Sequence, residues 1–82
     1  MSESSGLTPL SALRVGSWAH VRIVEGEPAV RVELLELGIV PGTRIQLQRI
    51  APLGDPLQVR VGRARLALRR AAADLVLTEP DA

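Results

Sequence analysis

Hydrophobic and polar residues alternate along several short stretches of the chain, which is the pattern of half-buried β-strands. The first stretch follows Ser17. Its inward set is expected to be Ala19, Val21 and Ile23, and its outward set Trp18, His20 and Arg22. The same alternation predicts further strands over 44–48, 57–61, 64–68 and 75–78. Five short strands of this kind predict an all-β chain folded as a small, closed or partly open barrel.

One or two short α-helices are predicted between these strands. Proline at the start and glycine at the end favour a helix over 29–37, and short helical turns are expected over 9–13 and 71–74. The core stripe of the main helix is predicted to consist of Val30, Leu34 and Leu37. Val32 and Leu35 project away from that stripe, so we expect them, with Arg31, to contact a partner protein.

The stretch from Ile50 to Val59, IAPLGDPLQV, is predicted to be a rigid connection between two strands. Its prolines remove backbone freedom and Gly54 permits a tight bend. Asp55 can accept hydrogen bonds from loop amides or from Arg49. Arg49, Gly54 and Asp55 are therefore expected to have a structural role.

The chain is short, with 82 residues and no cysteine, which predicts one small domain without disulfides. We expect the domain over 8–78, a disordered tail over 1–7 and a second tail over 79–82. The polar start lacks the features of a signal peptide, and no apolar run is long enough to span a membrane, so a cytoplasmic location is predicted. A domain of this size buries little surface, so a homodimer is one possibility.

Positive charge is concentrated in one part of the chain. The segment from Arg44 to Arg70 contains seven arginines and a single acidic residue. Alternation places Arg60, Arg65 and Arg69 on an outward face, where they can bind a partner. They could instead bind the phosphates of a nucleic acid, which is the alternative function. Trp18 is the only aromatic residue, and the lack of stacking platforms makes nucleic acid the less expected ligand.

The sequence offers little for catalysis or for metal binding. The only histidine lies within a predicted strand, there is no cysteine, and no glycine-rich phosphate loop occurs, so no catalytic residues and no required cofactor are expected. His20 is the one borderline ligand for a divalent ion such as Fe²⁺ or Zn²⁺. Because one chain supplies few partners for it, such a site is expected to be shared between subunits.

Three segments in a characteristic order resemble a known family. They are RVELLELGIVPG over 31–42, RIAPLGDP over 49–56 and LALRR over 66–70. Together they resemble the FeoA family of ferrous iron transport accessory proteins, and the resemblance extends from about Leu10 to Leu77. It implies an SH3-like barrel, a cytoplasmic location, no catalytic activity and binding to FeoB, the membrane iron transporter.

Overall fold

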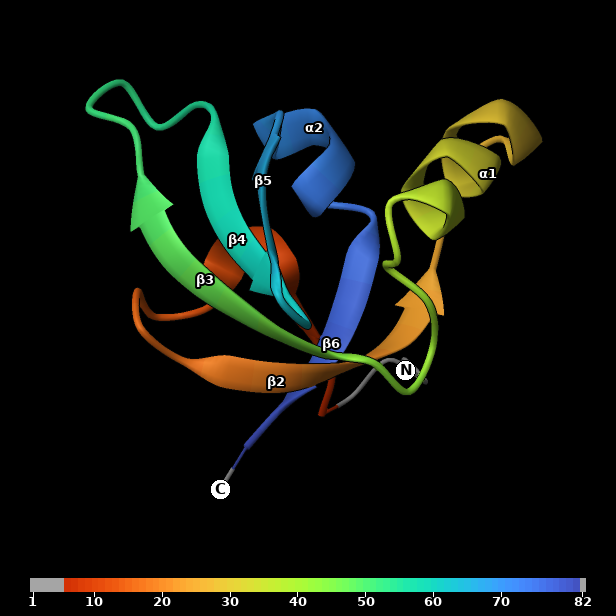
Figure 1. Cartoon of the computed structure of the whole chain (residues 1–82), viewed down its shortest axis with the longest axis horizontal. Coiled ribbons are helices and arrows are strands. Elements are labelled where there is room, and N and C mark those ends of the chain that lie inside the picture. Colours follow the sequence, from red (N-terminus) through yellow and green to blue (C-terminus); the bar gives the residue numbers. More distant parts are fainter. Residues whose placement is uncertain (1–5, 82) are drawn as a thin grey trace.

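The computed structural model describes residues 6–81, which form one bent antiparallel sheet with short helices at its rim (Figure 1). The strands are β1 (Thr8–Pro9), β2 (Trp18–Val24), β3 (Arg44–Ile50), β4 (Leu57–Val61), β5 (Ala64–Leu68) and β6 (Val76–Pro80). The helices are a 3₁₀ turn, η1 (Leu10–Ala12), and the α-helices α1 (Pro28–Glu36) and α2 (Arg70–Ala73). Most of the predicted tail over 1–7 lies outside the described residues.

The sheet has the strand order β1-β6-β2-β3-β4-β5. The strand β6, which follows all the others along the chain, therefore lies between β1 and β2. From β2 the sheet continues through β3 and the hairpin β4–β5, which bends over so that β5 lies in front of α2 in Figure 1. The edges of the sheet are β1, which is only two residues long, and β5.

The hydrophobic core lies inside the bend of the sheet, and most predicted inward positions line it. Each of the following residues is less than a tenth exposed: Leu10, Leu13, Ala19, Val21, Leu34, Ile39, Ile45, Leu47, Leu57, Val59, Val61, Leu68, Ala73 and Val76. Thr78 is buried with them, and its hydroxyl donates to the Thr8 carbonyl oxygen at 2.7 Å. The alternation of the sequence thus identified the buried face of the sheet.

The alternation fails at the end of β2. Ile23 was predicted to point inward, but it is 43% exposed, and its neighbour Val24 packs against the core instead. The cause is an irregularity in the pairing with β6, where Val21 is opposite Thr78 but Ile23 is opposite Leu77. An extra residue in one strand reverses the faces of the residues that follow it.

The stripe predicted for the main helix is wrong at its last position. Leu34 is buried and Val30 packs partly against the core, but Leu37 is 41% exposed. The helix ends at Glu36, and the chain turns at Gly38, so that Ile39 enters the core. The predicted exposure of Val32 and Leu35 is confirmed.

Two further differences concern the first and the last strand along the chain. A sixth strand, β1, forms because the segment predicted to begin a helical turn first pairs with β6. The strand β6 continues to Pro80, although a tail was predicted from residue 79. Glu79 and Pro80 pair with β2, and the Asp81 amide donates to the Trp18 carbonyl oxygen at 3.0 Å, so backbone hydrogen bonding extends the strand.

Candidate partner-binding surface

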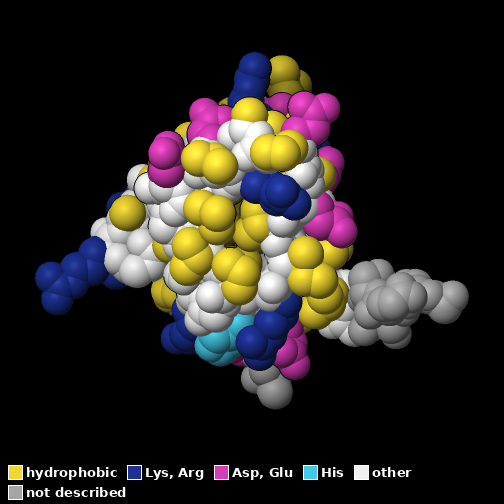
Figure 2. All heavy atoms as spheres, turned by 90° about the vertical axis from the view of Figure 1, so that its right-hand side faces the viewer, with side chains coloured by type: hydrophobic (Ala, Val, Ile, Leu, Met, Phe, Trp, Pro, Cys, Tyr) yellow, Lys and Arg dark blue, Asp and Glu magenta, His cyan; other side chains and the backbone are white. Residues whose placement is uncertain are grey.

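The outer face of α1 presents the exposed apolar pair expected from the sequence. Val32 is 51% exposed and Leu35 is 41% exposed, and the neighbouring Arg31 is also exposed. Figure 2 shows hydrophobic side chains gathered on the side of the molecule that carries α1, with charged groups around them. We call Arg31, Val32 and Leu35 the α1 patch.

The backbone at both ends of α1 holds this patch in place. Pro28 occupies the first turn, where its missing N–H leaves no hydrogen bond unmade. At the other end Gly38, with a φ of 92°, allows its own N–H to donate to the Leu35 carbonyl oxygen at 2.9 Å. The Ile39 amide donates to the Leu34 carbonyl oxygen at 3.1 Å and secures the last turn. The patch is therefore presented on a helix whose last turn is closed by backbone hydrogen bonds.

The predicted arginines lie on and beside the β4–β5 hairpin. Arg60 of β4 and Arg65 of β5 are directly opposite one another, and Arg69 immediately precedes α2. The Arg60 Nε donates to the Gly62 carbonyl oxygen at 3.3 Å, and none of these arginines forms an ion pair within residues 6–81. The predicted outward positions are confirmed, and their guanidinium charges are available to a ligand.

A groove lies between α1, β5 and α2. It has a volume of about 190 Å³ and is lined by Val30, Glu33, Leu34, Leu37, Ala67, Leu68, Arg69 and Ala72. Sequence reasoning missed this groove, because it depends on α1 lying beside β5 in space and no short-range pattern reports that. In this groove, Arg69 lines the same hollow as Val30 and Leu34 of α1.

The loop between β3 and β4 is held by Arg70, a residue to which the sequence analysis gave no role at this loop. The Asp55 carboxylate accepts from the backbone N–H of Arg70 at 3.0 Å, and the Arg70 Nε donates to the Gly54 carbonyl oxygen at 2.7 Å. Asp55 therefore caps the N-terminus of α2 and has no hydrogen bond to Arg49, which instead lines a hollow beside the loop. The structural role predicted for Gly54 and Asp55 agrees with these contacts, but the partner differs.

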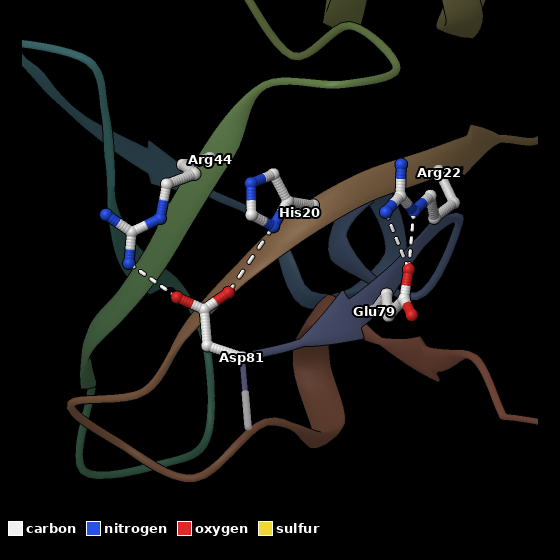
Figure 3. Close-up of polar contacts among 5 residues, drawn as sticks. All are labelled: His20, Arg22, Arg44, Glu79 and Asp81. Carbon is white, nitrogen blue, oxygen red and sulfur yellow. Dashed lines mark hydrogen bonds and ion pairs between the residues drawn. The ribbon is translucent and has the colours of Figure 1, made fainter.

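His20 lies on the outer face of β2 and pairs with an acidic residue near the C-terminus (Figure 3). The His20 Nδ1 lies 3.3 Å from the Asp81 Oδ1, and the Arg44 Nη2 lies 2.5 Å from the Asp81 Oδ2. The Arg44 guanidinium also stacks over the Trp18 ring, 4.6 Å from its centre. A second ion pair joins Arg22 of β2 to Glu79 of β6 at 2.7 Å.

This arrangement does not fit a metal site within one chain. Between residues 6 and 81, no three or more His, Asp or Glu side chains gather in a way that could hold a metal ion. His20 and Asp81 would supply two donors, whereas zinc is usually held by four ligands. The sequence analysis did not identify Asp81 as the partner of His20, because residues 79–82 were assigned to a tail.

The bent antiparallel sheet with its short helices defines a small SH3-like module. The chain belongs to the FeoA family, because the model of the FeoA domain matches residues 8–80. The structure of FeoA from Chlorobium tepidum is 40% identical, covers 92% of this chain and 71% of that one, and has a TM-score of 0.85. The resemblance seen in the sequence is thereby confirmed, and with it the association with ferrous iron transport.

Another solved relative confirms the fold. FeoA from Stenotrophomonas maltophilia, solved in complex with zinc and described as an SH3 domain protein, is 31% identical. The similarity covers 90% of this chain and 95% of that one, with a TM-score of 0.73. A manganese-dependent transcriptional repressor shares the fold alone, at 21% identity and a TM-score of 0.82 over 92% of this chain and 42% of its own.

The helices between residues 6 and 81 are short. None of them has the length and apolar character that crossing a membrane requires.

Proposed function

We propose that this protein is a non-enzymatic, cytoplasmic accessory module of ferrous iron uptake that binds the FeoB membrane transporter on its cytoplasmic side. Membership of the FeoA family supports the link to iron transport. The observation that carries the binding role is the α1 patch, an exposed apolar pair beside an arginine on a helix whose last turn is closed by backbone hydrogen bonds.

The α1 patch has the composition of an interface anchor. Covering a half-exposed valine or leucine contributes roughly 1 kcal/mol, because each removes apolar surface from water. Arg31 adjoins the pair and can form a charge-assisted hydrogen bond with a partner. Aromatic residues and arginine contribute much of the binding energy at many protein interfaces. In the α1 patch, Arg31 with its two aliphatic neighbours is expected to have this role.

The test of this proposal is binding to the cytoplasmic domain of FeoB from the same cell. We expect Leu35→Asp to weaken binding at least ~tenfold, because it places a charge in the apolar contact. Leu53→Asp is the matched control, since Leu53 is 96% exposed on the β3–β4 loop. The fold of each variant is checked by thermal melting.

Three outcomes would count against the α1 patch. Unchanged binding by a folded Leu35→Asp variant would place the contact elsewhere, and unfolding would show that Leu35 supports the core. Recovery of nucleic acid in place of FeoB would favour the alternative function suggested by the arginines.

We also propose that a divalent ion, Fe²⁺ or Zn²⁺, binds between two chains with His20 as a ligand. The zinc complex of the S. maltophilia relative supports this proposal, as does the position of His20 on an outer face where a second chain can approach it. The pairing of His20 with Asp81 supplies two donors from each chain.

A further inference from the structure

The strand β5 is an edge of the sheet, and its outer side has free backbone groups. Its partner is β4, to which it is joined by the two-residue turn Gly62-Arg63. Such a turn closes on a hydrogen-bonded pair, here Val61 and Ala64, and hydrogen-bonded and free pairs alternate from there. Arg65 and Ala67 therefore direct their N–H and C=O groups away from β4, and no described backbone group outside the strand ladder bonds to them.

The two sides of this edge have different chemical character. On the core side lies the groove between α1, β5 and α2, whose walls are mainly apolar and include Leu34, Leu37 and Leu68. On the outer side Arg65 lies opposite Arg60. An extended chain placed along β5 would direct successive side chains alternately toward the apolar groove and toward the arginines.

Ala67 lies between two hollows, one on each side of the β5 edge. It lines the groove on the core side and also a second hollow of about 220 Å³ on the outer side. That second hollow contains Arg49 and Gln58, so it offers polar groups as well as space. A cavity of about 150 Å³ holds a benzene molecule, so each hollow has room for one side chain of a ligand.

We propose that β5 binds an extended segment of a partner protein in which acidic and apolar residues alternate. The backbone of the segment pairs with Arg65 and Ala67 as an added strand, which is a common mode of peptide recognition. Its apolar side chains enter the groove between α1, β5 and α2. Its carboxylates face Arg60, Arg65 and Arg49.

The charge around β5 favours an acidic segment over a second copy of this chain. Between Arg44 and Arg70 the only acidic residue is Asp55, and its carboxylate already accepts from the Arg70 amide. Two β5 edges placed together would bring arginines from both copies close to one another, which is unfavourable. The arginines thus disfavour self-association through β5, as charged residues on edge strands do, while leaving the edge open to carboxylates.

This inference rests on the proposal that the protein is a binding module, because it names the kind of segment bound. Its test uses a synthetic peptide and no transporter. A failure here would leave binding to FeoB through the α1 patch untouched, and a failure of FeoB binding would leave the peptide result intact.

The experiment measures binding of a capped peptide of about eight residues, a usual strand length, that alternates Glu and Val. Two control peptides are used: the same composition with all Glu before all Val, and an alternating peptide with Lys in place of Glu. We expect the alternating acidic peptide to bind at least ~tenfold more tightly than either control, because its charges and backbone match the edge together. Hydrogen exchange at the Arg65 and Ala67 amides is expected to slow in the complex.

Two variants test the two parts of the proposal. Arg65→Glu should weaken the acidic peptide ~tenfold and strengthen the Lys peptide, and Arg14→Glu is the matched control because it makes the same charge change on an exposed residue outside the hairpin. Ala67→Pro should abolish binding by removing a free N–H, while a proline at an outward-facing edge position leaves the sheet folded.

Several results would overturn the proposal. They are equal binding of the scrambled peptide, an equal effect of Arg14→Glu, unchanged exchange at Arg65 and Ala67, or no binding of any peptide. If no peptide binds, the arginines would serve only to keep the β5 edge from pairing with other chains. Arg65→Glu decides the matter if Ala67→Pro fails to fold.

Discussion

At the scale of single residues, the contact between Asp55 and Arg70 joins the β3–β4 loop to the start of α2. These two residues are 15 positions apart in the sequence. The carboxylate satisfies the first free N–H of α2, and the Arg70 side chain returns to the Gly54 carbonyl oxygen. The β3–β4 loop and the start of α2 are thereby bonded to each other twice. The sequence indicated that Asp55 would be an acceptor, but its partner is fixed by the fold of the intervening hairpin.

Replacing Asp55 by alanine is expected to destabilise the domain without altering a chemical function. Loss of a helix cap costs about 1 kcal/mol, which lowers Tm by roughly 4–8 °C for a domain of this size. Thermal melts of Asp55→Ala and of Asp55→Asn measure the effect, and Asn should retain most of the stability because its side-chain oxygen still accepts. A melting temperature unchanged by Asp55→Ala, together with lost partner binding, would make Asp55 a contact residue.

At the scale of elements, the junction between β2 and α1 contains a glycine that packs closely against another segment. Gly26 has a φ of 109°, and a Cβ added there would lie 2.9 Å from the Leu75 Cδ1. The Leu75 backbone carbonyl oxygen also accepts a hydrogen bond from the Glu25 amide at 2.8 Å, which joins this junction to the segment before β6. The position of α1, and hence of the α1 patch, depends on a residue without a side chain at this point.

We expect Gly26→Ala to destabilise the domain more than Gly16→Ala does. Both glycines have a positive φ, 109° and 95°, but a Cβ at Gly16 would meet nothing within 4 Å. Strain alone should cost about 1 kcal/mol at either site, and at Gly26 the displacement of the Leu75 side chain should add a further cost. Urea midpoints of the two variants compare them directly, and equal losses would show that Leu75 moves aside freely.

At the scale of the whole molecule, residues 6–81 of one chain bring no three His, Asp or Glu side chains together that could hold a zinc ion. The pairing of His20 with Asp81 lies on the outer face of β2 and beyond the end of β6, where a second chain could add its own pair. Two chains together would then supply four donors, the number that zinc usually takes.

We therefore expect zinc to convert the protein from monomer to dimer, and His20→Ala to prevent this change. Sedimentation with and without zinc measures the change, and isothermal titration gives the number of ions per chain. Glu27→Ala is the control, since it removes an exposed carboxylate that forms no ion pair within residues 6–81. Equal zinc affinity of His20→Ala and the parent would remove His20 as a ligand.

Much of this molecule could be predicted because most of its strands are buried on one face only. Alternation then reports burial directly, as it did for Ile45, Leu47 and Val59. It could not report the bulge that exposes Ile23, since bulges arise from pairing with another strand. The exposure of Val32 and Leu35 followed from helix geometry, whereas the groove between α1, β5 and α2 and the capping of α2 by Asp55 depend on distant segments.

The position of β6 in the sheet has a consequence for the order of folding. Its pairing with β1 joins Thr8 to Thr78, and it also completes the pairing of β2. During synthesis, therefore, β1 and β2 are made long before the strand that separates them has left the ribosome. Contacts between such distant residues slow folding, so we expect the nascent sheet to remain incomplete until the C-terminal strand emerges.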